Sequence, residues 1–71
     1  MRIAVIGAGA WGTALADLLA RGKHDVWLWA HEDGVARDIR IRHENVRFLG
    51  GVPLAPALRA TTDPREAVAD A

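Results

Sequence analysis

The chain has 71 residues, and a domain of this size buries only about 60% of the surface that its unfolded chain exposes. Nine basic and nine acidic residues give zero net charge, which argues against a nucleic-acid partner, and the lack of cysteine excludes disulfides and thiolate zinc sites. No apolar run reaches the roughly 20 residues of a membrane span. The N-terminus leads directly into an apolar strand pattern, unlike a signal peptide, so we expect a cytoplasmic protein.

Three glycines, Gly7, Gly9 and Gly12, separate two different sequence patterns. The apolar run 2–6 before them is typical of a strand buried in a parallel sheet, and residues 10–21 after them predict a helix. In the strand–G-x-G-x-x-G–helix arrangement, the first glycine permits the turn and the second lets the backbone approach a diphosphate. The third lets the helix pack closely on the strand. The alternative is a tight turn without a ligand.

The sequence also predicts which face of the first helix is buried and where this helix ends. We expect it to pack on the sheet through Leu15, Leu18 and Leu19, which recur at helical spacing. Gly22 stands where a C′ glycine would end it. Residues 25–29 then predict a second strand, which a right-handed crossover would place parallel to the first and beside it.

A second, more polar helix is predicted over residues 35–43, with Asp33 as its N-cap. Its apolar stripe is narrow, so we expect it to lie on the surface. Four arginines lie in it or just after it, and a charge run of this kind usually forms a solvated face. They are Arg37, Arg40, Arg42 and Arg47.

The last part of the chain predicts a loop, a strand and a helix. Two glycines and two prolines over residues 48–57 are typical of a loop, and residues 58–62 predict a short third strand. Asp63 as N-cap, Pro64 at the first helical position and Glu66 at the third predict a helix start. The alanine-rich residues after it contain no residue typical of a helix end.

The predicted order of elements is β-α-β-α-β-α. This order is typical of an α/β fold, a Rossmann-type doubly wound parallel sheet, of which only the first half is present. We therefore interpret residues 1–71 as the N-terminal part of a NAD(P)-binding Rossmann domain without a complete second domain. The first strand would lie at the centre of a 3-2-1-4 sheet, and without a fourth strand its edge would be exposed. We expect the chain to be a fragment.

The residues after the second strand decide which dinucleotide such a site holds. An acidic residue at the strand tip would bond the ribose 2′-OH of NAD, but Ala30 and His31 stand there. His31 could donate to a 2′-phosphate, stack on adenine, or be a solvated loop residue. Glu32 could serve the ribose instead, so both NADP and NAD stay open as cofactors. Trp11, within the glycine motif, either has a packing or cofactor role or covers the helix start.

Residues 7–16, which read G-A-G-A-W-G-T-A-L-A, resemble the opening of bacterial-type NAD(P)-dependent glycerol-3-phosphate dehydrogenases. The similarity continues through residues 28–31, 44–49 and 58–63. The resemblance implies a full-length enzyme that reduces dihydroxyacetone phosphate to sn-glycerol 3-phosphate with NAD(P)H for phospholipid synthesis. A homodimer stays open. The family's catalytic lysines lie farther along the chain, so we expect neither catalytic residues nor metal ligands here.

The resemblance also assigns cofactor contacts. The candidate cofactor-binding residues are Gly7, Gly9, Ala10, Trp11, Gly12, His31 and Phe48. Ala10 and Trp11 would line the diphosphate and nicotinamide side, His31 would lie near the adenosine end, and Phe48 would lie beside the cofactor. Ala10 replaces the family's usual serine. The alternatives are another Rossmann dehydrogenase, of the 6-phosphogluconate or hydroxyacyl-coenzyme A type, and a non-catalytic NAD(H)-sensing module.

Overall fold

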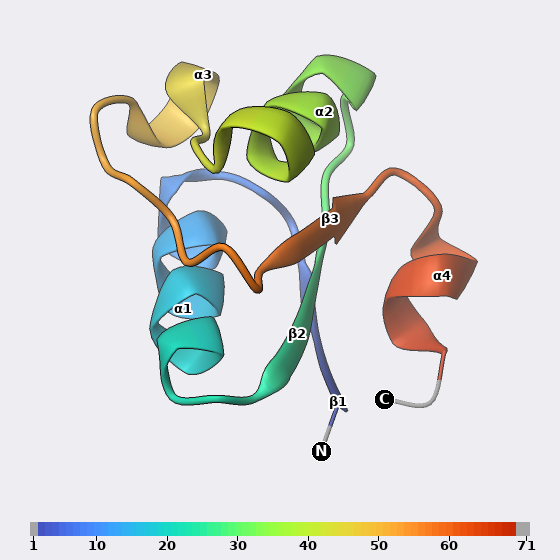
Figure 1. Cartoon of the computed structure of the whole chain (residues 1–71). Helices are drawn as coiled ribbons and strands as arrows, with labels where there is room; N and C mark the ends of the chain where they lie inside the picture. The colour runs from blue at the N-terminus through green and yellow to red at the C-terminus, as the bar shows by residue number, and fades with distance from the viewer. Residues whose placement is uncertain (1, 70–71) are drawn as a thin grey trace.

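A parallel three-stranded sheet forms the centre of the structure, a computed structural model that describes residues 2–69 (Figure 1). Its strands are β1 (Arg2–Ile6), β2 (Asp25–Trp29) and β3 (Arg59–Thr61). β2 lies in the middle and pairs with both neighbours, with Val5 opposite Leu28 in the first pair. The predicted parallel sheet, with its strands in the order 3-2-1, is confirmed.

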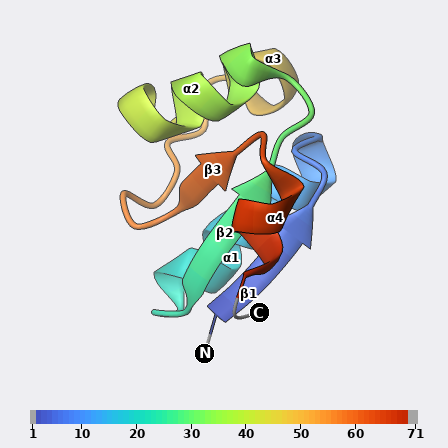
Figure 2. The ribbon, with the colours of Figure 1, turned by 90° about the vertical axis from the view of Figure 1, so that its right-hand side faces the viewer.

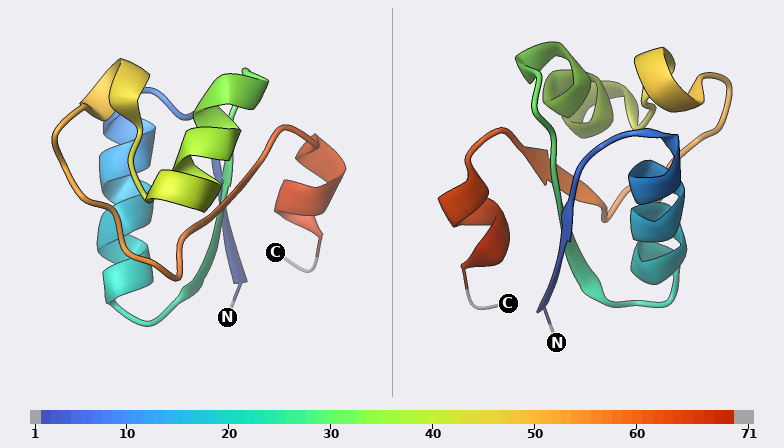
Figure 3. Two further views of the ribbon diagram at one scale, coloured as in Figure 1. Left: turned by 45° about the horizontal axis from the view of Figure 1, so that its top comes forward. Right: turned by 180° about the vertical axis from the view of Figure 1, so that it is seen from behind.

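Four helices surround this sheet: α1 (Ala10–Arg21), α2 (Asp33–Arg42), α3 (Val46–Leu49) and α4 (Pro64–Val68). α1 covers one face and α4 the opposite face, as the view along the sheet normal shows (Figure 2). α2 and α3 lie together at the end of the sheet where β1 and β2 finish (Figures 1 and 3). Within residues 2–69, every helix is too short or too polar to span a lipid bilayer.

The face of α1 that packs on the sheet differs from the prediction. Leu15 and Leu18 are 45% and 67% exposed, so they do not face the sheet, and only Leu19 packs against the core. Ala16 and Ala20 are buried there instead. The reason is the close approach of α1 to the turn after β1, described below, because a helix held so near leaves room only for small side chains. The leucine spacing was therefore a wrong guide to the buried face.

The C-terminal end of α1 is a Schellman motif. The Lys23 amide donates to the Ala20 carbonyl at 3.1 Å and the His24 amide donates to the Leu19 carbonyl at 3.3 Å. Gly22 is the C-cap with a φ of −77°, and the left-handed C′ position belongs to Lys23, with a φ of 69°. The predicted C′ position of Gly22 is wrong by one residue, because α1 ends at Arg21 and its cap residue still has near-helical backbone.

Replacing Lys23 by glycine should raise the free energy of unfolding by about 1 kcal/mol, because a side chain at positive φ crowds the backbone and glycine does not. Lys23→Ala is the matched control: it removes the long side chain but keeps the Cβ, and should change stability little. Denaturant unfolding of the three proteins measures this. Equal stability of the alanine and glycine variants would contradict the left-handed backbone at this position.

The second predicted helix is confirmed, but it begins earlier. Asp33 is its first residue and the extended Glu32 is the N-cap, without a side-chain cap, so the predicted capping role of Asp33 is wrong. Asp33 instead brings negative charge to the first turn, where the helix dipole favours it. Val35 and Ile39 form its narrow apolar stripe and are buried, and its exposed arginines agree with the predicted surface position of the helix.

The region predicted as a loop, residues 48–57, begins inside the short helix α3. Phe48 and Leu49 form its last turn, and the N-cap Asn45 accepts a hydrogen bond from the Phe48 amide at 3.2 Å. The nearby glycines and prolines led to the prediction of a loop, because they do not reveal that the buried N-cap Asn45 stabilises this helix. Residues 52–58 then lead to β3 without helix or strand, with a turn at residues 56–57.

The predicted third strand and last helix start are confirmed. β3 occupies three of the five residues predicted for it. Asp63 caps α4, and its carboxylate accepts from the Arg65 amide at 2.9 Å, with Pro64 in the first turn. α4 ends at Val68 with Ala69 as its C-cap, and residues 70 and 71 lie outside the described residues.

Candidate functional site

The glycine turn is fixed to the carboxyl end of β2. The Gly7 amide donates to the Trp29 carbonyl at 3.0 Å, and Gly7 has a φ of 110°, which a residue with a side chain rarely adopts. Gly9 is the N-cap of α1 in extended backbone, with no side chain capping this helix end. The turn therefore presents the start of α1 beside the ends of two parallel strands, where ligands of open α/β sheets bind.

Gly9 and Gly12 differ in the space around them. A Cβ on Gly12 would lie 1.9 Å from the Gly7 carbonyl oxygen, so any side chain would push α1 away from the turn. This is the close helix packing that the motif predicts. A Cβ on Gly9 would meet no atom within 4 Å, so the space above this residue is open. The turn thus has a packed side at Gly12 and an open side at Gly9.

A pocket of about 230 Å³ opens beside the turn. We call it the glycine pocket; its lining residues are Gly7, Ala8, Gly9, His31, Glu32, Val35 and Phe48. Four of the seven predicted site residues, from three separate parts of the chain, therefore line a single pocket. His31 lies with its ring 5.9 Å from that of Trp29 in an edge-on arrangement, and Phe48 reaches the pocket from α3.

The remaining three predicted residues lie elsewhere. Gly12 is packed beneath the turn, as described above. Ala10 and Trp11 line a shallow apolar surface on α1 together with Ala14, and Trp11 is 87% exposed. The structure therefore does not bring Trp11 together with His31 and Phe48 in the glycine pocket.

Asn45 connects the elements that surround the glycine pocket, and the sequence predicted no role for it. Its side chain is fully buried, and its Nδ2 donates to the Ala8 carbonyl and to Thr13 Oγ1, both at 2.8 Å. Its Oδ1 accepts from the Phe48 amide. One side chain thus ties the glycine turn, α1 and α3. The local signal in the sequence is an asparagine directly before the four residues of α3, a position typical of an N-cap.

An ion pair at the rim of the pocket was also missed. The Arg47 guanidinium pairs with the Glu32 carboxylate, and it lies 5.3 Å from the centre of the Phe48 ring. Glu32, proposed above as an alternative ribose ligand, is therefore paired with a cation from α3. The ion pair links residues 15 apart in sequence, and neither residue has a local pattern that predicts it.

Comparison with known families identifies the chain. Residues 2–71 match the family described as the N-terminus of NAD-dependent glycerol-3-phosphate dehydrogenase. The chain belongs to this family. The predicted resemblance is thereby confirmed over nearly the whole sequence.

Sequence identity to individual glycerol-3-phosphate dehydrogenases supports the same family. The chain is 60% identical over 62 residues to glycerol-3-phosphate dehydrogenase [NAD(P)+] of Desulfovibrio desulfuricans, covering 87% of this chain and 19% of that protein. It is 57% identical over 67 residues to the enzyme of the same name from Stenotrophomonas maltophilia strain K279a, covering 94% and 20%. The chain thus spans about a fifth of the length of these relatives.

Solved structures of glycerol-3-phosphate dehydrogenases have the same fold. The Coxiella burnetii enzyme superposes with a TM-score of 0.86 at 37% identity, covering 96% of this chain and 21% of that one. The Plasmodium falciparum enzyme superposes with a TM-score of 0.88 at 28% identity, covering 100% and 22%. The sheet and helices described above therefore correspond to a part of these larger proteins.

Proposed function

We propose that residues 1–71 form the N-terminal part of the NAD(P)-binding Rossmann domain of a longer glycerol-3-phosphate dehydrogenase. That enzyme reduces dihydroxyacetone phosphate to sn-glycerol 3-phosphate with NAD(P)H and so supplies phospholipid synthesis. The observation that carries the proposal is the open space at Gly9, at the uncapped start of α1. Family membership and the names of the relatives support the activity.

The turn fits a dinucleotide diphosphate. Backbone amides in the first turn of a helix have no partner within the helix, and the helix dipole favours negative charge there. The open side at Gly9 lets a phosphate oxygen come close to these amides, and Gly7 gives the turn its shape. Residues Gly7 to Gly12 would therefore hold the diphosphate, with Gly12 acting through the position of α1.

The other predicted residues would orient the two ends of the cofactor. His31 and Phe48 line the glycine pocket at the end of β2 and on α3, which suits the adenosine end. Ala10 and Trp11 lie on the other side of the turn and would face the nicotinamide side. When bound, the nicotinamide supplies hydride chemistry, and the role of this chain is to fix its position.

The remaining properties of the enzyme follow from the same proposal. The residues that bind the substrate and stabilise the developing alkoxide would lie outside residues 1–71. We propose a cytoplasmic location for the enzyme, and the balanced charge supports the absence of a nucleic-acid partner. A homodimer is compatible with the proposal.

Gly9→Ala in the full-length protein tests the proposal. Its Cβ meets no protein atom, so the unfolding curve should stay at the wild-type position, whereas affinity for NADH and NADPH should fall about 10-fold or more because the methyl group stands where the diphosphate approaches. Nucleotide titration and thermal unfolding measure the two effects.

Assays of the wild-type protein and of the variant distinguish the enzyme, the sensing module and a protein without a cofactor site. Wild-type protein that oxidises NAD(P)H only with dihydroxyacetone phosphate supports the enzyme. Binding of nucleotide without any reduction of this substrate would favour the sensing module. Wild-type protein that binds neither nucleotide, or a Gly9→Ala variant that binds as tightly as wild type, would overturn the cofactor site.

A further inference from the structure

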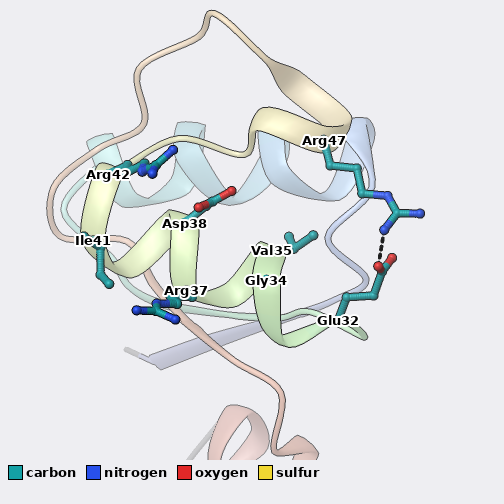
Figure 4. Close-up of a pocket in the computed structure, with 8 residues that line it drawn as sticks. All are labelled: Glu32, Gly34, Val35, Arg37, Asp38, Ile41, Arg42 and Arg47. Atoms are coloured by element: carbon teal, nitrogen blue, oxygen red, sulfur yellow. Dashed lines mark hydrogen bonds and ion pairs between the residues drawn. The ribbon is translucent and has the colours of Figure 1, made fainter.

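A second hollow, of about 490 Å³, adjoins the glycine pocket on the outer side of α2 (Figure 4). Glu32 and Val35 line both, so Glu32 stands at the boundary between them. We call it the arginine hollow; its charged lining residues are Glu32, Arg37, Asp38, Arg42 and Arg47. Three guanidinium groups against two carboxylates make this lining attractive to an anion.

An exposed ion pair lies at the boundary between the two hollows. Arg47 reaches across from α3 to pair with Glu32, as the dashed line in Figure 4 shows. Their side chains are 60% and 40% exposed, and ion pairs with such exposure contribute little stability because water screens them. Either side chain can therefore leave the ion pair and bind a ligand group without a large loss of protein stability.

The position of this pair matches the adenosine ribose in Rossmann sites. Glu32 lies 20 residues beyond Gly12, close after β2, where an acidic residue bonds a ribose 2′-OH and an arginine accommodates a 2′-phosphate. An unpaired carboxylate would repel a 2′-phosphate, since both groups are negative. Here the acid and the arginine are bonded to each other at the rim of the glycine pocket.

We propose that Arg47 is a specificity-determining residue and that its ion pair with Glu32 lets this site bind both NADPH and NADH. With NADPH, the guanidinium of Arg47 pairs with the 2′-phosphate and neutralises Glu32 beside it. With NADH, Arg47 holds the Glu32 carboxylate in place to accept from the 2′-OH. The proposal rests on the proposed function, because it places the adenosine end in the glycine pocket.

Substitution of the two partners in the full-length protein tests this, with Kd for NADPH and NADH as the readout. Arg47→Gln should raise the Kd for NADPH about 10-fold or more and that for NADH less than about 3-fold, because it removes a charge-assisted bond and leaves Glu32 unpaired. Glu32→Gln should shift the ratio the opposite way, by raising the Kd for NADH alone. Arg47→Lys, which keeps the charge, should restore part of the NADPH affinity.

Arg40→Gln is the matched control, since Arg40 lies on α2 outside the lining of both the arginine hollow and the glycine pocket and should leave both Kd values within about 2-fold. If wild type binds neither nucleotide, the proposed function fails. If both bind and Arg47→Gln leaves the ratio of the two Kd values unchanged, or raises both equally, Arg47 does not determine specificity and only this inference is overturned.

Discussion

Alanine at Gly12 should lower the free energy of unfolding by about 3 kcal/mol and weaken nucleotide binding about 100-fold. The added Cβ would lie 1.9 Å from the Gly7 carbonyl oxygen and 3.1 Å from its carbon. Both are backbone atoms, so no side-chain rotation can relieve the overlap. Either α1 or the glycine turn must move, and either movement displaces the amides that are proposed to hold the diphosphate.

Gly9→Ala is the matched control for this prediction, because it makes the same chemical change three residues earlier in open space. It should lose affinity and keep stability, whereas Gly12→Ala should lose both. Thermal unfolding and NADH titration of the two full-length variants separate these outcomes. A Gly12→Ala protein with the wild-type unfolding transition would show that α1 does not pack on the turn as the structure describes.

The fold was largely predictable because its signals are local. The helix over residues 10–21 begins and ends where predicted, between the glycine turn and Gly22, although the left-handed residue that ends it is Lys23. The apolar runs of β1 and β2 and the Asp63 cap are signals of the same kind. Each depends on residues within one turn or one strand, and sequence patterns report such neighbours well.

Packing between elements was not predictable in the same way. Leu15 and Leu18 have the spacing of a buried stripe, yet both are exposed, because contact at Gly12 decides which side of α1 meets the sheet. No property of the leucines themselves reveals this. The left-handed residue at the end of α1 is likewise Lys23 rather than the adjacent glycine, and intrinsic backbone preference alone favours the wrong one.

In the candidate site too, residues with local signals were predictable and residues that act through long-range contacts were not. The glycine turn came from a local motif, His31 from its place after the second strand and Phe48 from the family resemblance; the structure brings them into one pocket. The contacts of Asn45 join residues as many as 37 apart, and those of Arg47 join residues 15 apart. Single-sequence reasoning has no access to such pairs, because they exist only after β1, β2 and α3 have come together.

Asn45→Asp should be the most damaging change outside the glycine turn, lowering the free energy of unfolding by about 3 kcal/mol. The two side chains have nearly the same shape, so the change tests hydrogen bonding rather than packing. The amide Nδ2 donates to the Ala8 carbonyl and to Thr13 Oγ1, and a carboxylate oxygen in its place would face the Ala8 carbonyl with no hydrogen to donate. The site is fully buried, so water cannot compensate.

Nucleotide affinity should fall as well, since Ala8 and Phe48 both line the glycine pocket and Asn45 bonds to both. Denaturant unfolding and NADH titration of the full-length variant measure the two losses. Thr13→Val is the control: it keeps the shape of Thr13 and removes the hydroxyl that accepts one of the two Asn45 hydrogen bonds, so it should cost about 1 kcal/mol. Should Asn45→Asp prove no more costly than Thr13→Val, the bond to the Ala8 carbonyl would not hold the turn, and the proposed link between α3 and the diphosphate site would be lost.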